Sequence, residues 1–250
     1  MKVPRTPHRW TVTPARAIAI QRKLAAQVRI EPLPGPVRMV AGADVAFSPD
    51  ATTCVAAIVV WDLTRREVVE TVVARRPVTF PYVPGLLSFR EIPAVLAAVR
   101  KLRADPDVFL FDGQGLAHPR RFGLACHAGL CLDRPSIGCA KSLLCGEFVE
   151  PSPQRGARTA LTHADEVVGA VLRTRDGVRP VFVSIGHRIT LPDAVRLVLR
   201  CGGGYRLPEP TRLAHQHVTR ERSTNLNAGQ IKQTKPSPCE DLTRLRGRVS

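Results

Sequence analysis

Residues 107–121 place two carboxylates, an imidazole and two guanidinium groups on one short stretch of chain. The apolar run 108–111 ends in Asp112, and the sequence Gly-Gln-Gly follows at once. This pattern predicts a buried strand that delivers one carboxylate to its C-terminal end, beside a turn that another backbone can approach closely. His118 and the arginine pair 120–121 follow shortly afterwards. Together these groups suit chemistry on a phosphate better than they suit packing.

Two further acids lie where a carboxylate needs an explanation. Asp44 interrupts the apolar segment 40–47, so it is paired, protonated or metal-bound in a buried strand, or it faces water from an edge strand. Glu91 completes a capping box with Ser88, yet Pro93 also allows the helix to start later, with Glu91 at its mouth. With the acid after the strand, three carboxylates on adjacent elements would hold Mg²⁺ or Mn²⁺, because both ions prefer oxygen ligands and retain reactive waters.

Three other side chains have both a chemical and a structural interpretation. His118, followed by a proline, could move a proton or could be a satisfied structural histidine. Lys141 ends an apolar segment and could neutralise phosphate charge or simply be solvated. Tyr82 lies between two prolines and could stack on bases or pack on its own domain. Nothing local distinguishes His215 from a surface histidine.

Hydrophobic periodicity predicts that a mixed α/β sheet flanked by helices positions these groups. We expect strands at 40–47, 54–61, 67–74, 108–111, 136–140, 167–173 and 180–184, and helices at 15–28, 88–105, 121–133 and 190–200. Short turns join the first three strands, which predicts an antiparallel meander, and βαβ units follow. The dipeptide Asp176-Gly177 predicts a hairpin turn between the last two strands.

Composition is typical of a globular protein with a surplus of positive charge. The 250 residues carry a formal net charge of +16 and a pI near 10.7, which favours polyanionic partners, although an arginine-biased genome would give the same surplus. The sequence has no apolar run as long as a membrane span and no continuous apolar segment at its start, so we expect a cytoplasmic protein without a membrane partner. The seven cysteines are odd in number and form no C-x-x-C, which predicts reduced thiols.

Six segments, in this order along the chain, jointly resemble the endonuclease V family, the deoxyinosine-specific repair nucleases. The segments are AGADVAF (41–47), FPYVPGLLSFRE (80–91), PDVFLFDGQGLAHPRRFG (106–123), PSIGCAKS (135–142), VFVSIGH (181–187) and RLPEPTRLAH (206–215). The combination of DGQGLAHPR with PYVPGLLSFRE is specific to that family. The resemblance implies a catalytic domain at 1–217, and the polar, basic remainder at 218–250 is expected to be a disordered tail.

The resemblance also implies a fold, an activity and a set of site residues. The family has a ribonuclease H-like fold and uses a divalent metal to hydrolyse the second phosphodiester bond 3′ to a deaminated adenine in DNA. Its metal-binding acids match Asp44, Glu91 and Asp112, and its other catalytic positions match Lys141, His215 and His118. Its strand-separating wedge matches Pro81, Tyr82, Val83 and Pro84, and its base pocket matches Gly85, Leu87, Gly113, Gly123 and Gly138.

The expected protein is therefore a monomeric deoxyribonuclease V-type repair enzyme, with Mg²⁺ or Mn²⁺ as cofactor and deoxyinosine-containing DNA as partner. One alternative is an inosine-specific ribonuclease on the same scaffold, because some family members favour RNA. Another is a catalytically inactive nucleic-acid-binding protein, although the presence of all three acids counts against it.

Overall fold

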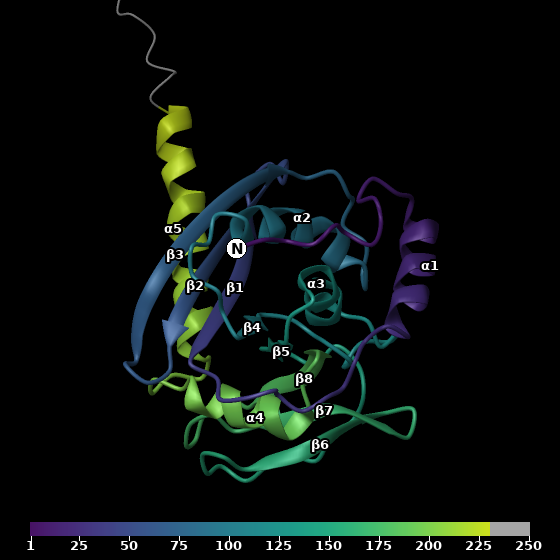
Figure 1. The fold of residues 1–250 in the computed structure, drawn as a ribbon, viewed down its shortest axis with the longest axis vertical. Helices are drawn as coiled ribbons and strands as arrows, with labels where there is room; N and C mark the ends of the chain where they lie inside the picture. Colours follow the sequence, from purple (N-terminus) through teal and green to yellow (C-terminus); the bar gives the residue numbers. More distant parts are fainter. Residues whose placement is uncertain (231–250) are drawn as a thin grey trace, which may run out of the picture.

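The structure, a computed structural model, describes residues 1–230, with side chains as far as Arg222. Its strands form one eight-stranded mixed sheet in the order β3-β2-β1-β4-β5-β8-β7-β6 (Figure 1). The strands are β1 (Met39–Phe47), β2 (Thr53–Asp62), β3 (Glu67–Pro77), β4 (Val108–Phe111), β5 (Ser136–Ala140), β6 (Arg158–His163), β7 (Glu166–Leu172) and β8 (Val181–His187).

The first three strands form the antiparallel meander that their β-branched sequences and short connections predict. Strand β4 pairs parallel with β1 on one side and with β5 on the other. Because parallel strands end at the same edge of a sheet, the C-terminal ends of β1, β4 and β5 lie together, and we call this the carboxyl edge. The mixed sheet confirms the predicted fold class.

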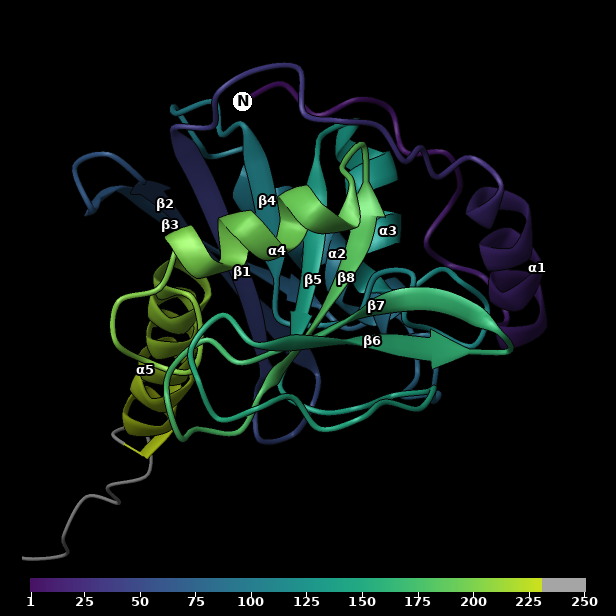
Figure 2. The ribbon, with the colours of Figure 1, turned by 90° about the horizontal axis from the view of Figure 1, so that it is seen from below.

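Helices cover both faces of the sheet. They are α1 (Pro14–Ala25), α2 (Leu87–Val99), α3 (Leu124–Leu132), α4 (Leu191–Arg200) and α5 (Glu209–Gln230). Figure 2 shows α4 crossing the face opposite α2 and α3. Helix α5 packs against β1 and β2, and α1 lies at the side of the molecule near α3 (Figure 1).

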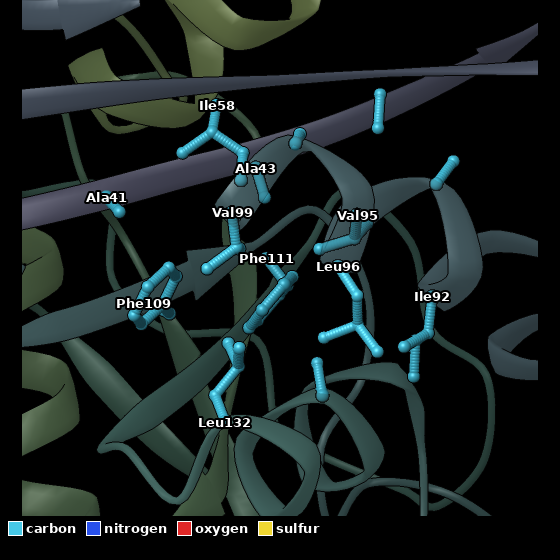
Figure 3. Close-up of a cluster of buried hydrophobic side chains, with 14 of the residues drawn as sticks. Ala41, Ala43, Ile58, Ile92, Val95, Leu96, Val99, Phe109, Phe111 and Leu132 are labelled. Carbon is cyan, nitrogen blue, oxygen red and sulfur yellow. The ribbon is translucent and has the colours of Figure 1, made fainter. Parts of the chain in front are cut away.

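The larger core lies between the sheet and helices α2 and α3 (Figure 3). Phe109 and Phe111 of β4 are buried there with stacked rings, the centroids 6.3 Å apart. Leu110, between them, faces the opposite way and joins a second core beneath α4. By the same alternation along β1, Asp44 lies on the same face of the sheet as Val40, which belongs to the second core beneath α4. The strands of the sheet are thus buried on both faces around the site.

Helix α1 packs on a third, smaller core. Thr13 caps its first turn by accepting a hydrogen bond from the backbone N–H of Arg16, and a proline occupies the first helical position. Its inward stripe consists of Ala17, Ile20, Gln21 and Leu24. This stripe faces a cluster that includes Phe80, Phe89 and Phe122. Helix α1 therefore lies against the loops that lead into α2 and α3.

The structure differs from the sequence-based expectations in two elements. Strand β6 was not predicted, because it is an edge strand with one buried residue, Leu161, and a largely polar sequence. Helix α5 continues to Gln230, so the predicted domain boundary at 217/218 falls inside a helix. The packing of α5 on the sheet stabilises a segment that is too polar to predict as helix from periodicity. The rest of the predicted tail, 231–250, lies outside the described residues.

Two other observations concern the cysteines and the membrane. The six cysteines in the described part of the chain are all free thiols, and Cys239 lies outside it. Between residues 1 and 230, no helix has the length and apolar character needed to cross a membrane.

Candidate active site

Asp44 and Asp112 lie side by side at the carboxyl edge. The register of the parallel strands pairs Ala43 with Phe111, so the next residue in each chain is an aspartate. The backbone N–H of Asp112 donates to the carbonyl of Ala43, which continues the ladder one step further. Both carboxylates are largely buried, with side-chain exposures of 11% and 13%. Asp44 is on a central strand, so the alternative of an edge-strand aspartate facing water is wrong.

His215 on helix α5 is held against Asp44. Its Nδ1 lies 2.7 Å from Asp44 Oδ2, and the imidazole is 52% exposed. The helix reaches this position because Gly42 of β1 has no side chain: a Cβ there would lie 2.1 Å from the carbonyl carbon of Pro210. Gly42 thus fixes how closely α5 approaches β1, and with it the distance between the histidine and the acid.

Lys141, directly after β5, forms an ion pair with Asp112. Lys141 Nζ lies 2.5 Å from Asp112 Oδ2, and the lysine side chain is 38% exposed. The carbonyl oxygen of the same lysine accepts a hydrogen bond from Arg206, which fixes the backbone at the end of β5. The lysine is therefore a partly exposed cation anchored beside the acid, and the interpretation of a freely solvated lysine is wrong.

Glu91 approaches the aspartates from helix α2. The helix begins at Leu87 with Leu86 as its N-cap and no side-chain cap, so the predicted capping box does not form. Ser88 contacts His127 instead, with 2.9 Å between Oγ and Nδ1. The alternative of a helix starting later is also wrong, because Pro93 lies inside α2 and Glu91 is 6% exposed within it.

Burial and neighbouring charge disfavour ionisation of Glu91 and Asp44. Burial, with Asp44 and Asp112 nearby, raises the pKa of Glu91 to about 8. Burial and the charge of Asp112 raise the pKa of Asp44, which the hydrogen bond from His215 partly opposes. A divalent cation would relieve this repulsion, so the donor set fits such an ion. As the side chains of the described residues lie, no three His, Cys, Asp or Glu groups converge closely enough to hold one.

A cavity of about 370 Å³ opens directly beside Asp112 and Lys141. We call it the base cavity, after the base pocket that the resemblance to endonuclease V implies at these positions. Its walls come from the loop before α2, the loop after β4 and the loop after β5. It is lined by Gln21, Tyr82, Val83, Pro84, Gly85, Leu87, Ser88, Asp112, Gly113, Gln114, His118, Gly123, Leu124, Ala140, Lys141, Ser142, Leu143 and Leu144. The lining thus includes the predicted positions Gly85, Leu87, Gly113 and Gly123, while Gly138 packs beneath the 113–115 turn.

The rim of the base cavity carries exposed apolar side chains. Tyr82 is 71% exposed, so the alternative in which it packs on its own domain is wrong. Val83 and Pro84 line the cavity beside it, and Pro81 precedes them in the same loop. Leu143 and Leu144, at 42% and 48% exposure, add apolar surface from the loop after β5. These leucines were not predicted, because the sequence does not show that they are exposed.

His118 has both ring nitrogens engaged by the backbone. Its Nδ1 accepts from the N–H of Arg120 at 3.1 Å, so Nε2 carries the proton and donates to the carbonyl of Gly85 at 3.1 Å. Burial and the charge of Arg120 lower the pKa of His118 to about 4. The structure thus places His118 in the wall of the base cavity as a neutral hydrogen-bonding residue.

Gln21, Gln114 and Arg120 also line or brace the base cavity. The sequence singled out Arg120 for chemistry on a phosphate, whereas Gln21 and Gln114 were not predicted as functional. Gln114 donates to the carbonyl of Ser142, which ties the loop after β4 to the loop after β5. Gln21 and Arg120 contact Gly85 from the opposite wall. For Gln21 a signal was present, because a glutamine in the apolar stripe of an amphipathic helix needs a buried partner.

A second hollow lies at the opposite end of the strands. It measures about 530 Å³ and is lined by residues such as Asp107, Asp133 and Arg188 at the entries to β4 and β5 and beyond β8. Its charges are already paired: Arg188 with Glu31 and Asp133, and Asp107 with backbone N–H groups. The carboxyl edge, where buried acids repel one another, is the better candidate for chemistry.

Comparison with known proteins identifies the family. A sequence profile described as Endonuclease V matches residues 22–216. The Endonuclease V of Trichormus variabilis is 52% identical over 209 residues, which cover 83% of this chain and 95% of that protein. The crystal structure of the Endonuclease V of Streptomyces avermitilis is 42% identical with a TM-score of 0.83, and the match covers 90% of this chain and 100% of that one.

A more distant relative is known with nucleic acid bound. Endonuclease V of Ciona intestinalis, crystallised with a 23mer DNA that contains an inosine followed by a ribo-adenosine, is 26% identical with a TM-score of 0.74. That match covers 86% of this chain and 100% of the Ciona chain. The chain described here therefore belongs to the endonuclease V family of nucleases that act on DNA, and it has that family's ribonuclease H-like fold.

Proposed function

We propose that this protein is a divalent-metal-dependent endonuclease that recognises deoxyinosine in DNA and hydrolyses the second phosphodiester bond on its 3′ side, as the first step of repair. The observation that carries the proposal is the pair of buried aspartates, Asp44 and Asp112, near enough to Glu91 for their charges to raise its pKa, beside a cavity of about 370 Å³ at the carboxyl edge. All of these groups come from one chain, which supports a monomeric enzyme.

The three acids would hold Mg²⁺, or Mn²⁺ in its place. A bound divalent ion activates water and stabilises the leaving phosphate oxygen. Lys141 lies beside the same acids and supplies a positive charge for a phosphate at the carboxyl edge. Because Asp44 engages Nδ1 of His215, Nε2 is the ring nitrogen that can exchange a proton with substrate or water.

The base cavity provides a place for a nucleotide that has left the duplex. Its predicted glycine positions allow a base to meet backbone N–H and C=O groups at short range. Tyr82 at the rim is placed to stack in the gap that the departed base leaves. The Ciona relative was crystallised with inosine-containing DNA, which supports inosine as the base that the cavity receives.

The test is cleavage of a labelled duplex that holds one deoxyinosine, with a matched deoxyadenosine duplex as control. In Mg²⁺ we expect cleavage of the first duplex, mapped to the second phosphodiester 3′ to the lesion, and none after chelation. Cutting of both duplexes alike, or at another bond, would contradict the proposal. Binding without any cutting would indicate a nucleic-acid-binding protein without nuclease activity.

A ribonuclease acting on inosine-containing RNA is the second candidate. The nucleic acid in the Ciona complex carries a ribo-adenosine directly after the inosine, so that relative accommodates a 2′-hydroxyl next to the lesion. Parallel digestion of DNA and RNA oligonucleotides of the same sequence, each with one inosine, decides between the two substrates. Faster cleavage of the RNA at equal enzyme concentration would favour the second candidate.

A further inference from the structure

The carbonyl oxygen of Gly85 receives three hydrogen bonds from side chains. Gln21 Nε2 donates to it at 3.0 Å, His118 Nε2 at 3.1 Å and Arg120 Nη2 at 2.7 Å. A carbonyl oxygen has two lone pairs, so three donors, one of them a cation, exceed what satisfying that acceptor requires. The arrangement holds the end of the Tyr82 loop in one place.

Gly85 needs such support because its backbone has a conformation that other residues rarely adopt. Its φ is +76°, and a Cβ at this position would lie 2.6 Å from Arg120 Nη2. The loop therefore reaches the guanidinium only through a glycine. A turn of this kind is stable in one geometry when its surroundings determine it, and here the surroundings are Gln21, His118 and Arg120.

Gln21 is the member of this cluster that joins both walls of the base cavity. Its Nε2 donates to the carbonyls of Gly85 and Phe122, the latter at 3.2 Å, and its Oε1 accepts from Arg120 Nε at 2.6 Å. The residue is 1% exposed and belongs to the inward stripe of α1. Because every polar atom of the Gln21 side chain is bound to protein, it acts on the cavity through Gly85 and Arg120 and not by contact with a base.

We propose that Gln21 is a positioning residue, which sets the geometry of the base cavity by fixing the Tyr82 loop and the loop after β4 to helix α1. Selectivity for inosine then depends on helix α1, which packs on the loops of the cavity and contributes no proposed catalytic residue. This inference rests on the proposed function, because it assumes that the cavity receives the base. It predicts that losing the Gln21 hydrogen bonds impairs recognition more than it impairs the folding of α1.

The test compares Gln21→Met with Leu24→Ala. Methionine keeps the length of the side chain and removes its hydrogen bonds, whereas Leu24→Ala weakens the packing of the same helix and leaves the hydrogen bonds intact. For Gln21→Met we expect kcat/KM on the deoxyinosine duplex to fall by about 10- to 100-fold, because small misplacements in active sites have effects of this size. The rise in KM should exceed the fall in kcat. Leu24→Ala should lower Tm and leave the preference for inosine over adenine unchanged.

Hydrogen exchange of the free protein gives a readout that does not depend on activity. Exchange in peptides that contain residues 81–86 should be faster in Gln21→Met than in the parent protein, and unchanged in Leu24→Ala. Unaltered exchange and selectivity in Gln21→Met would overturn the inference, and so would an equal loss of selectivity in Leu24→Ala. A parent protein without any inosine preference would overturn the proposed function and this inference together. A parent with preference whose Gln21→Met variant keeps it would overturn the inference alone.

Discussion

Glu91 is the acid of the site that no ion pair neutralises in the described part of the chain. Asp44 has His215 within hydrogen-bonding distance, and Asp112 has Lys141. Glu91 has instead a buried position and two carboxylates nearby, which together raise its pKa to about 8. A cation that binds here must displace the proton of Glu91, so metal affinity should rise with pH up to that value.

Replacing Glu91 with glutamine should stabilise the protein in the presence of chelator, increasingly so at higher pH. The pKa of Glu91 in the folded protein, about 8, lies above its usual value of 4.5. The contribution of protonated Glu91 to the free energy of unfolding is therefore complete below pH 4.5 and is lost as the pH rises through 8. Between pH 4.5 and pH 8, each pH unit lowers the free energy of unfolding of the parent protein by at most about 1.4 kcal/mol. Urea unfolding of both proteins at pH 5 and pH 8 measures the difference, and a gap that does not change with pH would refute this assignment.

Asp112→Ala should abolish cleavage and preserve the fold. The carboxylate is at a strand end and pairs with Lys141, so its removal takes away a proposed metal ligand without opening the apolar core. We expect a loss of more than about 100-fold, the upper range for residues that merely support a metal ligand. Single-turnover cleavage in Mg²⁺ and a thermal melt measure the two effects. The control is Asp105→Ala, which breaks a surface ion pair with Arg134, and normal turnover by Asp112→Ala would rule out the proposed mechanism.

Asp44 and Asp112 could be predicted from the sequence, whereas the surroundings of Glu91 and Gln21 could not. Burying an unpaired carboxylate is costly, so an acid that interrupts or ends an apolar strand indicates a partner or a ligand. The strand pattern also places such an acid at the carboxyl edge of the sheet. Glu91 matched a local capping pattern, and only the packing of α2 against the sheet showed that it is buried instead. Gln21 makes contacts with residues more than sixty positions away, which no local pattern contains.

Three loops at the carboxyl edge build the base cavity, and each is fixed at a defined point. Gly85 anchors the loop before α2, Gln114 joins the loop after β4 to the carbonyl of Ser142, and Arg206 holds the end of β5. The sequence predicted a glycine turn after β4 and a proline-containing loop at Tyr82, and strands β4 and β5 were predicted closely. The contacts that join one loop to another depend on the tertiary fold and were beyond sequence patterns.

Tyr82→Ala should weaken binding to the lesion more than it slows cleavage at saturating enzyme. The side chain is exposed at the cavity rim, and stacking on a base contributes about 1–3 kcal/mol. This range corresponds to a rise in Kd of about 5- to 150-fold. Fluorescence anisotropy with an inosine duplex in Ca²⁺ measures Kd. Tyr205→Ala is a matched control, because Tyr205 is 53% exposed, stacks on Arg212 and does not line the cavity. Equal affinity of Tyr82→Ala and the parent would exclude the wedge role.

At the scale of the whole molecule, the net charge of +16 favours association with nucleic acid regardless of sequence. Part of this surplus lies in residues 231–250, which contain five Lys and Arg and two acidic residues. No residue of the proposed site is among them. Because α5 continues to Gln230 and contacts the sheet, a deletion that tests the basic end should begin after that residue.

Deleting residues 231–250 should weaken binding to damaged and undamaged DNA alike and leave the cleavage position unchanged. For every phosphate that this segment neutralises in the full chain, the deletion should make the slope of log affinity against log salt shallower by about 0.9. Affinities of both proteins at several salt concentrations measure the slope. Identical slopes would show that this segment does not bind DNA, and a selective loss of inosine preference would place it in the recognition site.

The pairing of Asp44 with His215 joins positions 171 residues apart in the chain. A ribosome makes the whole sheet before it makes the helix that carries the histidine, and α5 docks on β1 only where Gly42 leaves room. A nascent chain, or a fragment that ends before α5, therefore lacks the histidine that pairs with Asp44. We expect such incomplete chains to cleave no nucleic acid, so that nuclease activity begins only once α5 has been made and has docked on the sheet.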